Sequence, residues 1–156
     1  MENLLNQKEW NQIAEIELVY KSQIKASERP KVVTSKDCYK LLRRTWDDGK
    51  IDLLEQFKIL LLNRRNRVLG IYEVSTGGMT GTVADVRLIF TAALKAGSCA
   101  IVLCHNHPSG NLKPSKADEE LTYKIREAAR FFDIKVIDHI IVSHDGYFSF
   151  ADEGML

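Results

Sequence analysis

Apolar and polar residues follow one another along the chain in two kinds of pattern, one typical of strands and one of helices. Dense or alternating apolar runs predict strands over residues 11–24, 57–62, 68–74, 100–104, 134–142 and 147–150. Apolar residues at three- and four-residue spacing predict helices from Thr34 or Ser35 to Gly49, from Val83 to Gly97 and from Ser115 to Phe132. Because helices and strands alternate, the expected fold class is α/β or mixed α+β, a sheet with helices packed on it.

The length and composition are those of one globular domain. The chain has 156 residues, of which 45% are hydrophobic and 28% charged, and this mixture excludes a disordered chain, a collagen-like repeat and a disulfide-rich miniprotein. Lys and Arg number 22 and Asp and Glu number 21, which gives a net charge of +1. A charge this small gives no electrostatic reason to expect a protein that lives on nucleic acid or acidic lipid.

The cysteines and the apolar runs indicate a compartment. Cys38, Cys99 and Cys104 are odd in number and lack CxxC spacing, so we expect reduced, buried thiols and no disulfide framework. The N-terminal residues carry several glutamates and no apolar run of signal-peptide length. No stretch approaches the roughly 20 apolar residues that cross a bilayer. We therefore expect a cytoplasmic protein with no membrane partner.

The segment that follows the 100–104 strand carries the most informative polar residues. If the strand continues, His105 and His107 point to the same face, because residues two apart in a strand share a face. A loop rich in proline and glycine then leads to a helix whose first turn holds Asp118. Two imidazoles and one carboxylate, with a fourth position open to water, form the ligand set of a catalytic zinc site. Two alternatives stay open: solvated loop histidines, and a capping box between Ser115 and Asp118.

This segment resembles a known family. The letters HNHPSG at 105–110, followed by SKAD at 115–118, resemble the JAMM motif of MPN/JAB-domain metalloproteins, and their wording is similar to that of the RadC group. The resemblance runs from about Phe57 to the end of the chain. It implies a single MPN/JAB-like (cytidine-deaminase-like) domain over 53–156, a mixed sheet flanked by helices. Residues 1–52 would be a strand–helix extension packed on that domain.

The resemblance also assigns roles to individual residues. It implies that His105, His107 and Asp118 bind Zn²⁺ and that Ser115 assists the oxyanion. Glu73, in the segment IYEVSTG, matches the family's E-x-S-x-G stretch and would activate the bound water. Without the resemblance, Glu73 would be interpreted as an exposed strand glutamate.

These roles make a zinc-dependent hydrolase of the metallopeptidase or isopeptidase type the expected function, with a peptide or isopeptide substrate and a traditional link to DNA repair. The alternative is a DNA-associated accessory or binding module whose metal site is structural or vestigial. Phosphodiester cleavage is less favoured, because two-metal nucleases need more carboxylates than this segment offers. Asp138-His139 either orients a metal ligand or forms a structural pair at the strand.

One departure from the family bears on nucleic acid. RadC proteins of the usual type carry a helix-hairpin-helix-like region before this domain, and the residues before Phe57 lack a glycine-bearing hairpin. The basic clusters at Arg43-Arg44 and at 64–67 are either solvated surface or phosphate contacts. We therefore expect any nucleic-acid binding to be weak, and we make no prediction of oligomeric state.

Overall fold

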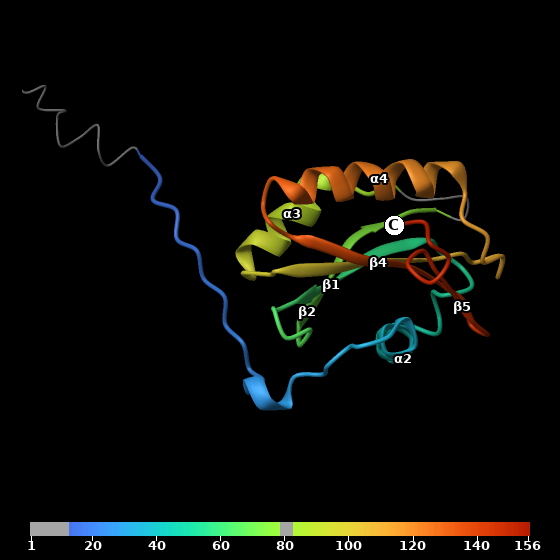
Figure 1. Ribbon diagram of the computed structural model, residues 1–156, viewed down its shortest axis with the longest axis horizontal. Coiled ribbons are helices and arrows are strands. Elements are labelled where there is room, and N and C mark those ends of the chain that lie inside the picture. The colour runs from blue at the N-terminus through green and yellow to red at the C-terminus, as the bar shows by residue number, and fades with distance from the viewer. Residues whose placement is uncertain (1–12, 79–82) are drawn as a thin grey trace, which may run out of the picture.

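A five-stranded sheet in the order β2-β1-β3-β4-β5 forms the centre of the molecule (Figure 1). The computed structural model describes residues 13–78 and 83–156. The strands are β1 (Gln56–Leu62), β2 (Val68–Thr76), β3 (Ala100–Asn106), β4 (Lys135–Val142) and β5 (Tyr147–Ser149). The helices are the short 3₁₀ helix η1 (Ala26–Glu28) and the α-helices α2 (Ser35–Thr45), α3 (Val86–Lys95) and α4 (Lys116–Arg130). The predicted mixed α+β class is confirmed.

The sheet combines antiparallel and parallel pairing. β1 runs antiparallel to β2 and to β3, and β5 runs antiparallel to β4. β3 and β4 are parallel, and helix α4 forms the crossover that such a pair requires. Every residue of β3 is buried, which confirms the central strand that its apolar run predicts.

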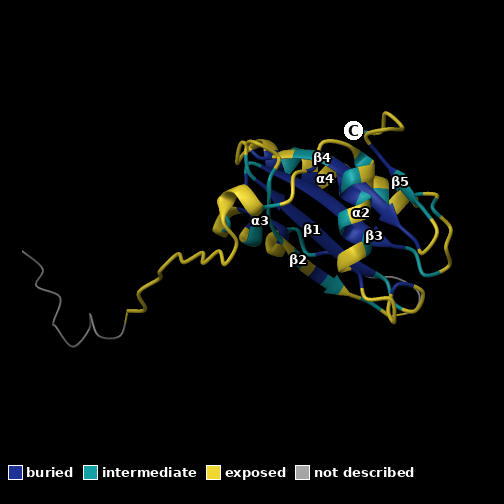
Figure 2. Cartoon of the chain, turned by 90° about the horizontal axis from the view of Figure 1, so that it is seen from below, coloured by how far each residue is buried: buried dark blue, intermediate teal, exposed yellow. Residues whose placement is uncertain are grey.

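Helices cover both faces of the sheet. α3 and α4 pack on one face, and α2 packs on the other. Successive residues of β3 alternate between the two layers, so that Leu103 belongs to the α3/α4 layer and Cys104 to the α2 layer. His105 comes next and therefore faces α4. Figure 2 shows the central strands β1 and β3 buried along their length, with the exposed residues mainly on the outer surfaces of the helices and in the loops.

The helix ends follow from capping side chains. Thr34 is the N-cap of α2, one of the two residues that the sequence offers, and it forms a capping box with Asp37. α2 ends at Thr45 and not at Gly49, because Trp46 leaves the helix in an extended conformation and is buried against the sheet. α3 begins at Val86, after the N-cap Asp85, so the predicted start at Val83 was three residues early.

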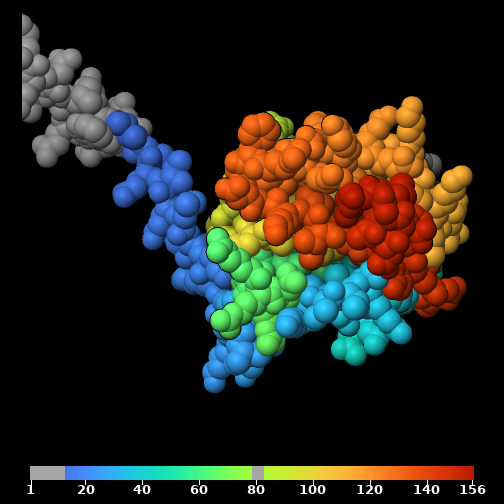
Figure 3. All heavy atoms as spheres, viewed as in Figure 1, coloured from blue at the N-terminus to red at the C-terminus, as the bar shows by residue number. Residues whose placement is uncertain are grey.

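The predicted strand over 11–24 is wrong for its described part. Residues 13–24 form no strand; Ile16 is 86% exposed and Leu18 is 81% exposed. The segment extends away from the body of the molecule (Figures 1 and 3). It is linked to β2 by Tyr20, whose hydroxyl donates to the Leu69 carbonyl at 2.8 Å. Alternation predicts a strand only where a neighbouring strand supplies the ladder of hydrogen bonds, and no strand of the described residues pairs with this segment.

The structure also bears on the predicted glycine-rich loop, the cysteines and the absence of a membrane span. Residues 11 and 12 of the predicted strand and residues 79–81 of the glycine-rich loop lie outside the described residues. Cys38 and Cys104 are buried and unpaired as expected, whereas Cys99 is half-buried. Among the described helices, none is both long and apolar enough to cross a membrane.

Candidate metal centre

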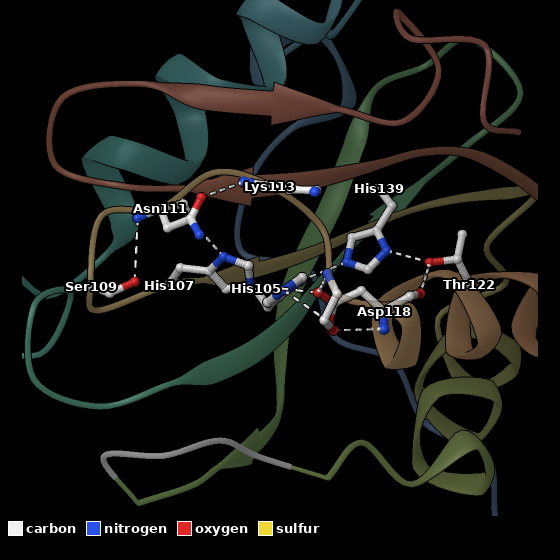
Figure 4. Close-up of polar contacts among 9 residues, drawn as sticks. His105, His107, Ser109, Asn111, Lys113, Asp118, Thr122 and His139 are labelled. Atoms are coloured by element: carbon white, nitrogen blue, oxygen red, sulfur yellow. Dashed lines mark hydrogen bonds and ion pairs between the residues drawn. The ribbon is translucent and has the colours of Figure 1, made fainter.

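The end of β3 and the first turn of α4 bring His105, His107 and Asp118 together (Figure 4). The Nε2 atoms of the two histidines lie 2.9 Å apart. Asp118 places Oδ1 at 3.3 Å from His105 Nε2 and Oδ2 at 3.6 Å from His107 Nε2. Three potential ligand atoms thus converge on one point, as the spacing of the sequence predicts.

The loop after β3 turns His107 toward this point. The carbonyl oxygen of Asn111 can only accept, so the His107 Nδ1–H donates to it, at 2.5 Å. Gly110 adopts a φ of +79°, and its amide donates to the His107 carbonyl at 2.9 Å. The bond at Nδ1 leaves the Nε2 lone pair of His107 directed at the shared point.

Asp118 both caps helix α4 and faces the histidines. Its Oδ2 accepts from the Ser115 amide at 2.7 Å, and its own amide donates to the Ser115 hydroxyl oxygen at 3.1 Å. This is the capping box that the sequence allowed, and it coexists with the contacts to His105 and His107. The cap therefore holds the carboxylate in place beside the two histidines. The capping box is confirmed, and the role of Asp118 as a metal ligand stays a prediction.

Electrostatics favour an ionised carboxylate beside the two imidazoles. Burial opposes ionisation of Asp118, yet the neighbouring side chains of His105 and His107 hold its pKa well below the usual range. Asp118 in turn raises the pKa of His107, and the charge of Glu55 adds to that rise at longer range. Two imidazole nitrogens and a carboxylate that face one another can hold a cation between them. The donor set of two histidines and one aspartate fits zinc in an open site.

Glu73 lies apart from these three residues. It is exposed on the edge strand β2, and its Oε1 accepts from the Thr76 hydroxyl at 2.5 Å. β1 separates β2 from β3, and Glu73 lies opposite Lys58, whose neighbour on β3 is Cys104. Since Cys104 belongs to the α2 layer, Glu73 shares a row with residues of the face opposite His105. Its role as the base stays a prediction.

Glu55 is an acidic residue near the site that the sequence analysis did not single out. It directly precedes β1, where Phe57 lies opposite His105. Its carboxylate is one of the charges that raise the pKa of His107, after Asp118. In the sequence Glu55 is merely a polar residue before an apolar strand. Its proximity to the histidines depends on the pairing of β1 with β3, which no local pattern specifies.

Asn106 holds the segment that carries Glu55. Its side chain is fully buried, and its Oδ1 accepts from the Gln56 amide at 2.7 Å. Its Nδ2 donates to the carbonyls of Ile51 and Leu54, each at 2.7 Å. The residue between the two histidines therefore points away from them and fastens the chain just before β1.

Asp138 and His139 have different surroundings: His139 contacts a candidate metal ligand, and Asp138 makes structural contacts. His139 Nε2 lies 2.8 Å from His105 Nδ1, so His139 contacts a metal-ligand candidate directly. Asp138 points elsewhere and accepts from the Ser149 hydroxyl at 2.6 Å and the Ala151 amide at 3.0 Å. Burial raises the pKa of Asp138 and lowers the pKa of His139. Asp138 is thus a structural residue of the β4–β5 end, and His139 is a partner of the site.

Comparison with known proteins identifies the family. Residues 32–155 match the family described as RadC-like JAB domain. A UPF0758 protein of Flavobacterium johnsoniae is 42% identical over 125 residues, which are 80% of this chain and 53% of that protein. A UPF0758 protein of Porphyromonas gingivalis is 45% identical over 103 residues, which are 65% of this chain and 45% of that protein. A UPF0758 protein of Rubrobacter xylanophilus is 38% identical over 130 residues, which are 82% of this chain and 55% of that protein. The chain spans about half the length of these relatives.

Proposed function

Because the chain belongs to the RadC-like JAB domain family, we propose that it is a zinc-dependent hydrolase of the metallopeptidase type, acting on an amide bond in a peptide or isopeptide. One observation carries the proposal: His105, His107 and Asp118 present their ligand atoms to one point at the end of a buried strand. A structural zinc site closes four positions, whereas this set of three leaves room for water and substrate.

The residues of the chain can divide the reaction among them. A bound zinc ion would supply a Lewis acid that makes water a nucleophile at neutral pH. A glutamate would take the proton from the water and return it to the leaving amine. The Ser115 hydroxyl, held at the start of α4, would donate to the oxyanion that develops on the substrate carbonyl. Asp118, kept ionised by the two histidines, would stay a ligand throughout.

Two glutamates compete for the role of base. Glu73 matches the family's pattern in the sequence, but it lies on the edge strand and bonds Thr76. Glu55 is close enough to raise the pKa of His107, and the strand that it precedes pairs with β3. The strand pairing favours Glu55, because Phe57, two residues later, lies opposite His105, and a base must come within hydrogen-bond reach of the water. We therefore place Glu55 ahead of Glu73.

Parallel substitutions test the proposal. Purified protein should carry about one zinc ion per chain, measured by mass spectrometry, and His107→Ala should remove it. Glu55→Gln should retain zinc and fold and lose roughly 10²- to 10⁴-fold in turnover of a peptide and isopeptide panel. Glu73→Gln, the matched control, should change turnover little; the opposite pattern would return the role of base to Glu73. Full metal occupancy in His107→Ala would refute the site.

The accessory-module alternative has little support from the basic side chains. Arg43 pairs with Asp48 at 2.7 Å, and Arg67 donates to the Arg29 carbonyl at 2.8 Å. Arg65, at the hairpin turn, is exposed. We propose that any binding to DNA is weak, independent of sequence and lost as salt increases. Fluorescence anisotropy with a labelled duplex tests this, and salt-resistant, sequence-specific binding would favour the accessory module.

A further inference from the structure

We propose that His139 and Thr122 form a relay of hydrogen bonds that fixes the tautomer of His105 and thereby selects the nitrogen that His105 offers to the metal. The inference rests on the proposed metal site, and it assigns a positioning role to two residues outside the ligand set. The relay comprises His105, His139, Thr122 and the backbone carbonyl of Asp118 (Figure 4).

Short contacts connect the members of the relay in one line. His105 Nδ1 lies 2.8 Å from His139 Nε2, and His139 Nδ1 lies 2.6 Å from the Thr122 hydroxyl. The Thr122 hydroxyl also lies 2.6 Å from the carbonyl oxygen of Asp118. His105, His139 and Thr122 are each at most 3% exposed, so water does not compete for these groups.

The direction of every hydrogen bond follows from the last acceptor. A carbonyl oxygen can only accept, so the Thr122 hydroxyl donates its proton to Asp118. The Thr122 oxygen must then accept from His139, which places a proton on His139 Nδ1. His139 Nε2 is left with a lone pair and accepts from His105 Nδ1–H. The remaining lone pair of His105 is on Nε2, the atom that faces His107 and Asp118.

Apolar rings hold His139 in this position. The Phe150 ring stacks on the imidazole with centroids 4.6 Å apart, and the Phe57 ring meets it edge-on at 5.6 Å. Among the described residues, the nitrogens of the His139 ring bond only to His105 and Thr122. A protonated imidazole would also be costly here, because burial disfavours the charged form.

Asp118 lies at both ends of the relay. Asp118 contacts His105 through its carboxylate and ends the relay through its carbonyl. A helical threonine often bonds the carbonyl four residues earlier, and Thr91 does so with Arg87 on α3 at 2.7 Å. Thr91 thus has the same local bond without a histidine, and it provides a matched control. What distinguishes Thr122 is its second bond, to His139.

Metal affinity tests the relay apart from catalysis. Thr122→Val keeps the shape of the side chain and removes the acceptor for His139 Nδ1–H. His139 can then carry its proton on Nε2 and donate it to His105 Nδ1, which leaves the proton of His105 on Nε2, the atom that should face the metal. Co²⁺ binding, followed by its visible absorption and by competition with a chelating dye, should weaken about 10- to 100-fold. Thr122→Ser should restore wild-type affinity, and Thr91→Val should leave it unchanged. Equal affinity in Thr122→Val and wild type would overturn the relay.

A measurement on the unmutated protein keeps the inference falsifiable if Thr122→Val does not fold. In the zinc-loaded protein, ¹⁵N-edited NMR of the imidazoles should show His139 neutral with its proton on Nδ1, the minor tautomer of a free histidine. A proton on His139 Nε2 would refute the relay. Loss of Co²⁺ binding in His107→Ala, with equal binding in Thr122→Val, would leave the metal site standing and the relay wrong. Retained binding in His107→Ala would instead refute the site itself.

Discussion

Asn106→Leu should destabilise the fold by an amount that can be worked out from its contacts. The asparagine side chain is fully buried and makes three hydrogen bonds of 2.7 Å, to the Gln56 amide and to the carbonyls of Ile51 and Leu54. Leucine has a similar volume and can form none of them. At roughly 0.5–1.5 kcal/mol for each bond, the free energy of unfolding should fall by about 3 kcal/mol.

Urea unfolding followed by circular dichroism gives the measurement. Asn63→Ala is the matched control, because the Asn63 Oδ1 also accepts from two backbone amides, at a hairpin turn that water reaches. Its loss should be about 1 kcal/mol or less, since water replaces the missing acceptor. A loss below about 1 kcal/mol in Asn106→Leu would show that the segment before β1 is held by other contacts.

Asn106→Asp separates the acceptor from the donors at the same position. A carboxylate can still accept from the Gln56 amide, but it faces the carbonyl oxygens of Ile51 and Leu54, to which it cannot donate. We expect this variant to be at least as unstable as Asn106→Leu at neutral pH and to regain stability at acidic pH, when the carboxyl carries a proton. Equal stability of Asn106→Asp and wild type at neutral pH would refute the assigned bonds.

Three further results should follow from the described contacts. Burial raises the pKa of Asp138 above its ordinary 3.8, so the protonated carboxyl stabilises the fold fully below pH 3.8, and this stabilisation is lost as the pH rises. In urea unfolding, Asp138→Asn should therefore gain stability relative to wild type from about pH 4 to pH 7. A difference that stays constant with pH would contradict this. A thiol reagent at pH 8 should label half-buried Cys99 first, because burial raises the pKa of Cys104 and raises the pKa of Cys38 to about 12. Simultaneous labelling of all three would disprove that order. Gly110→Ala should cost about 1–2 kcal/mol in the same unfolding assay and weaken Co²⁺ binding, since φ is +79° beside His107; unchanged affinity would show that the turn does not position the histidine.

Local patterns predicted most of the elements and the three side chains that converge at the end of β3. The apolar run of β3 predicted a central strand, and the two-residue spacing of His105 and His107 predicted side chains on one face. Ser115 and Asp118 signalled the start of α4 through a capping box that the structure confirms. These features depend on residues close together in the sequence, for which strand alternation and helix capping give direct rules.

Contacts between distant segments could not be predicted in the same way. Residues 13–24 have the alternation of a strand but no partner strand within residues 13–78 and 83–156, so the pattern predicted the wrong structure. Glu55 approaches His107 only because β1 pairs with β3, and His139 reaches His105 only because β4 lies on the other side of β3. Such neighbours are set by sheet order, which a single sequence leaves open.

The three candidate ligands are close together in the sequence, whereas the residues that surround them come from distant segments, and this affects how a metal would change folding. His105, His107 and Asp118 lie within a 14-residue stretch, whereas Glu55 and His139 arrive from other strands of the sheet. An unfolded chain would therefore already carry the three proposed ligands close together and would itself have some affinity for zinc. Metal bound to the unfolded state offsets part of the stabilisation that metal gives the folded state. The increase in unfolding free energy on adding zinc should thus measure how well the sheet preorganises the ligands, and it should be smaller than the total affinity suggests.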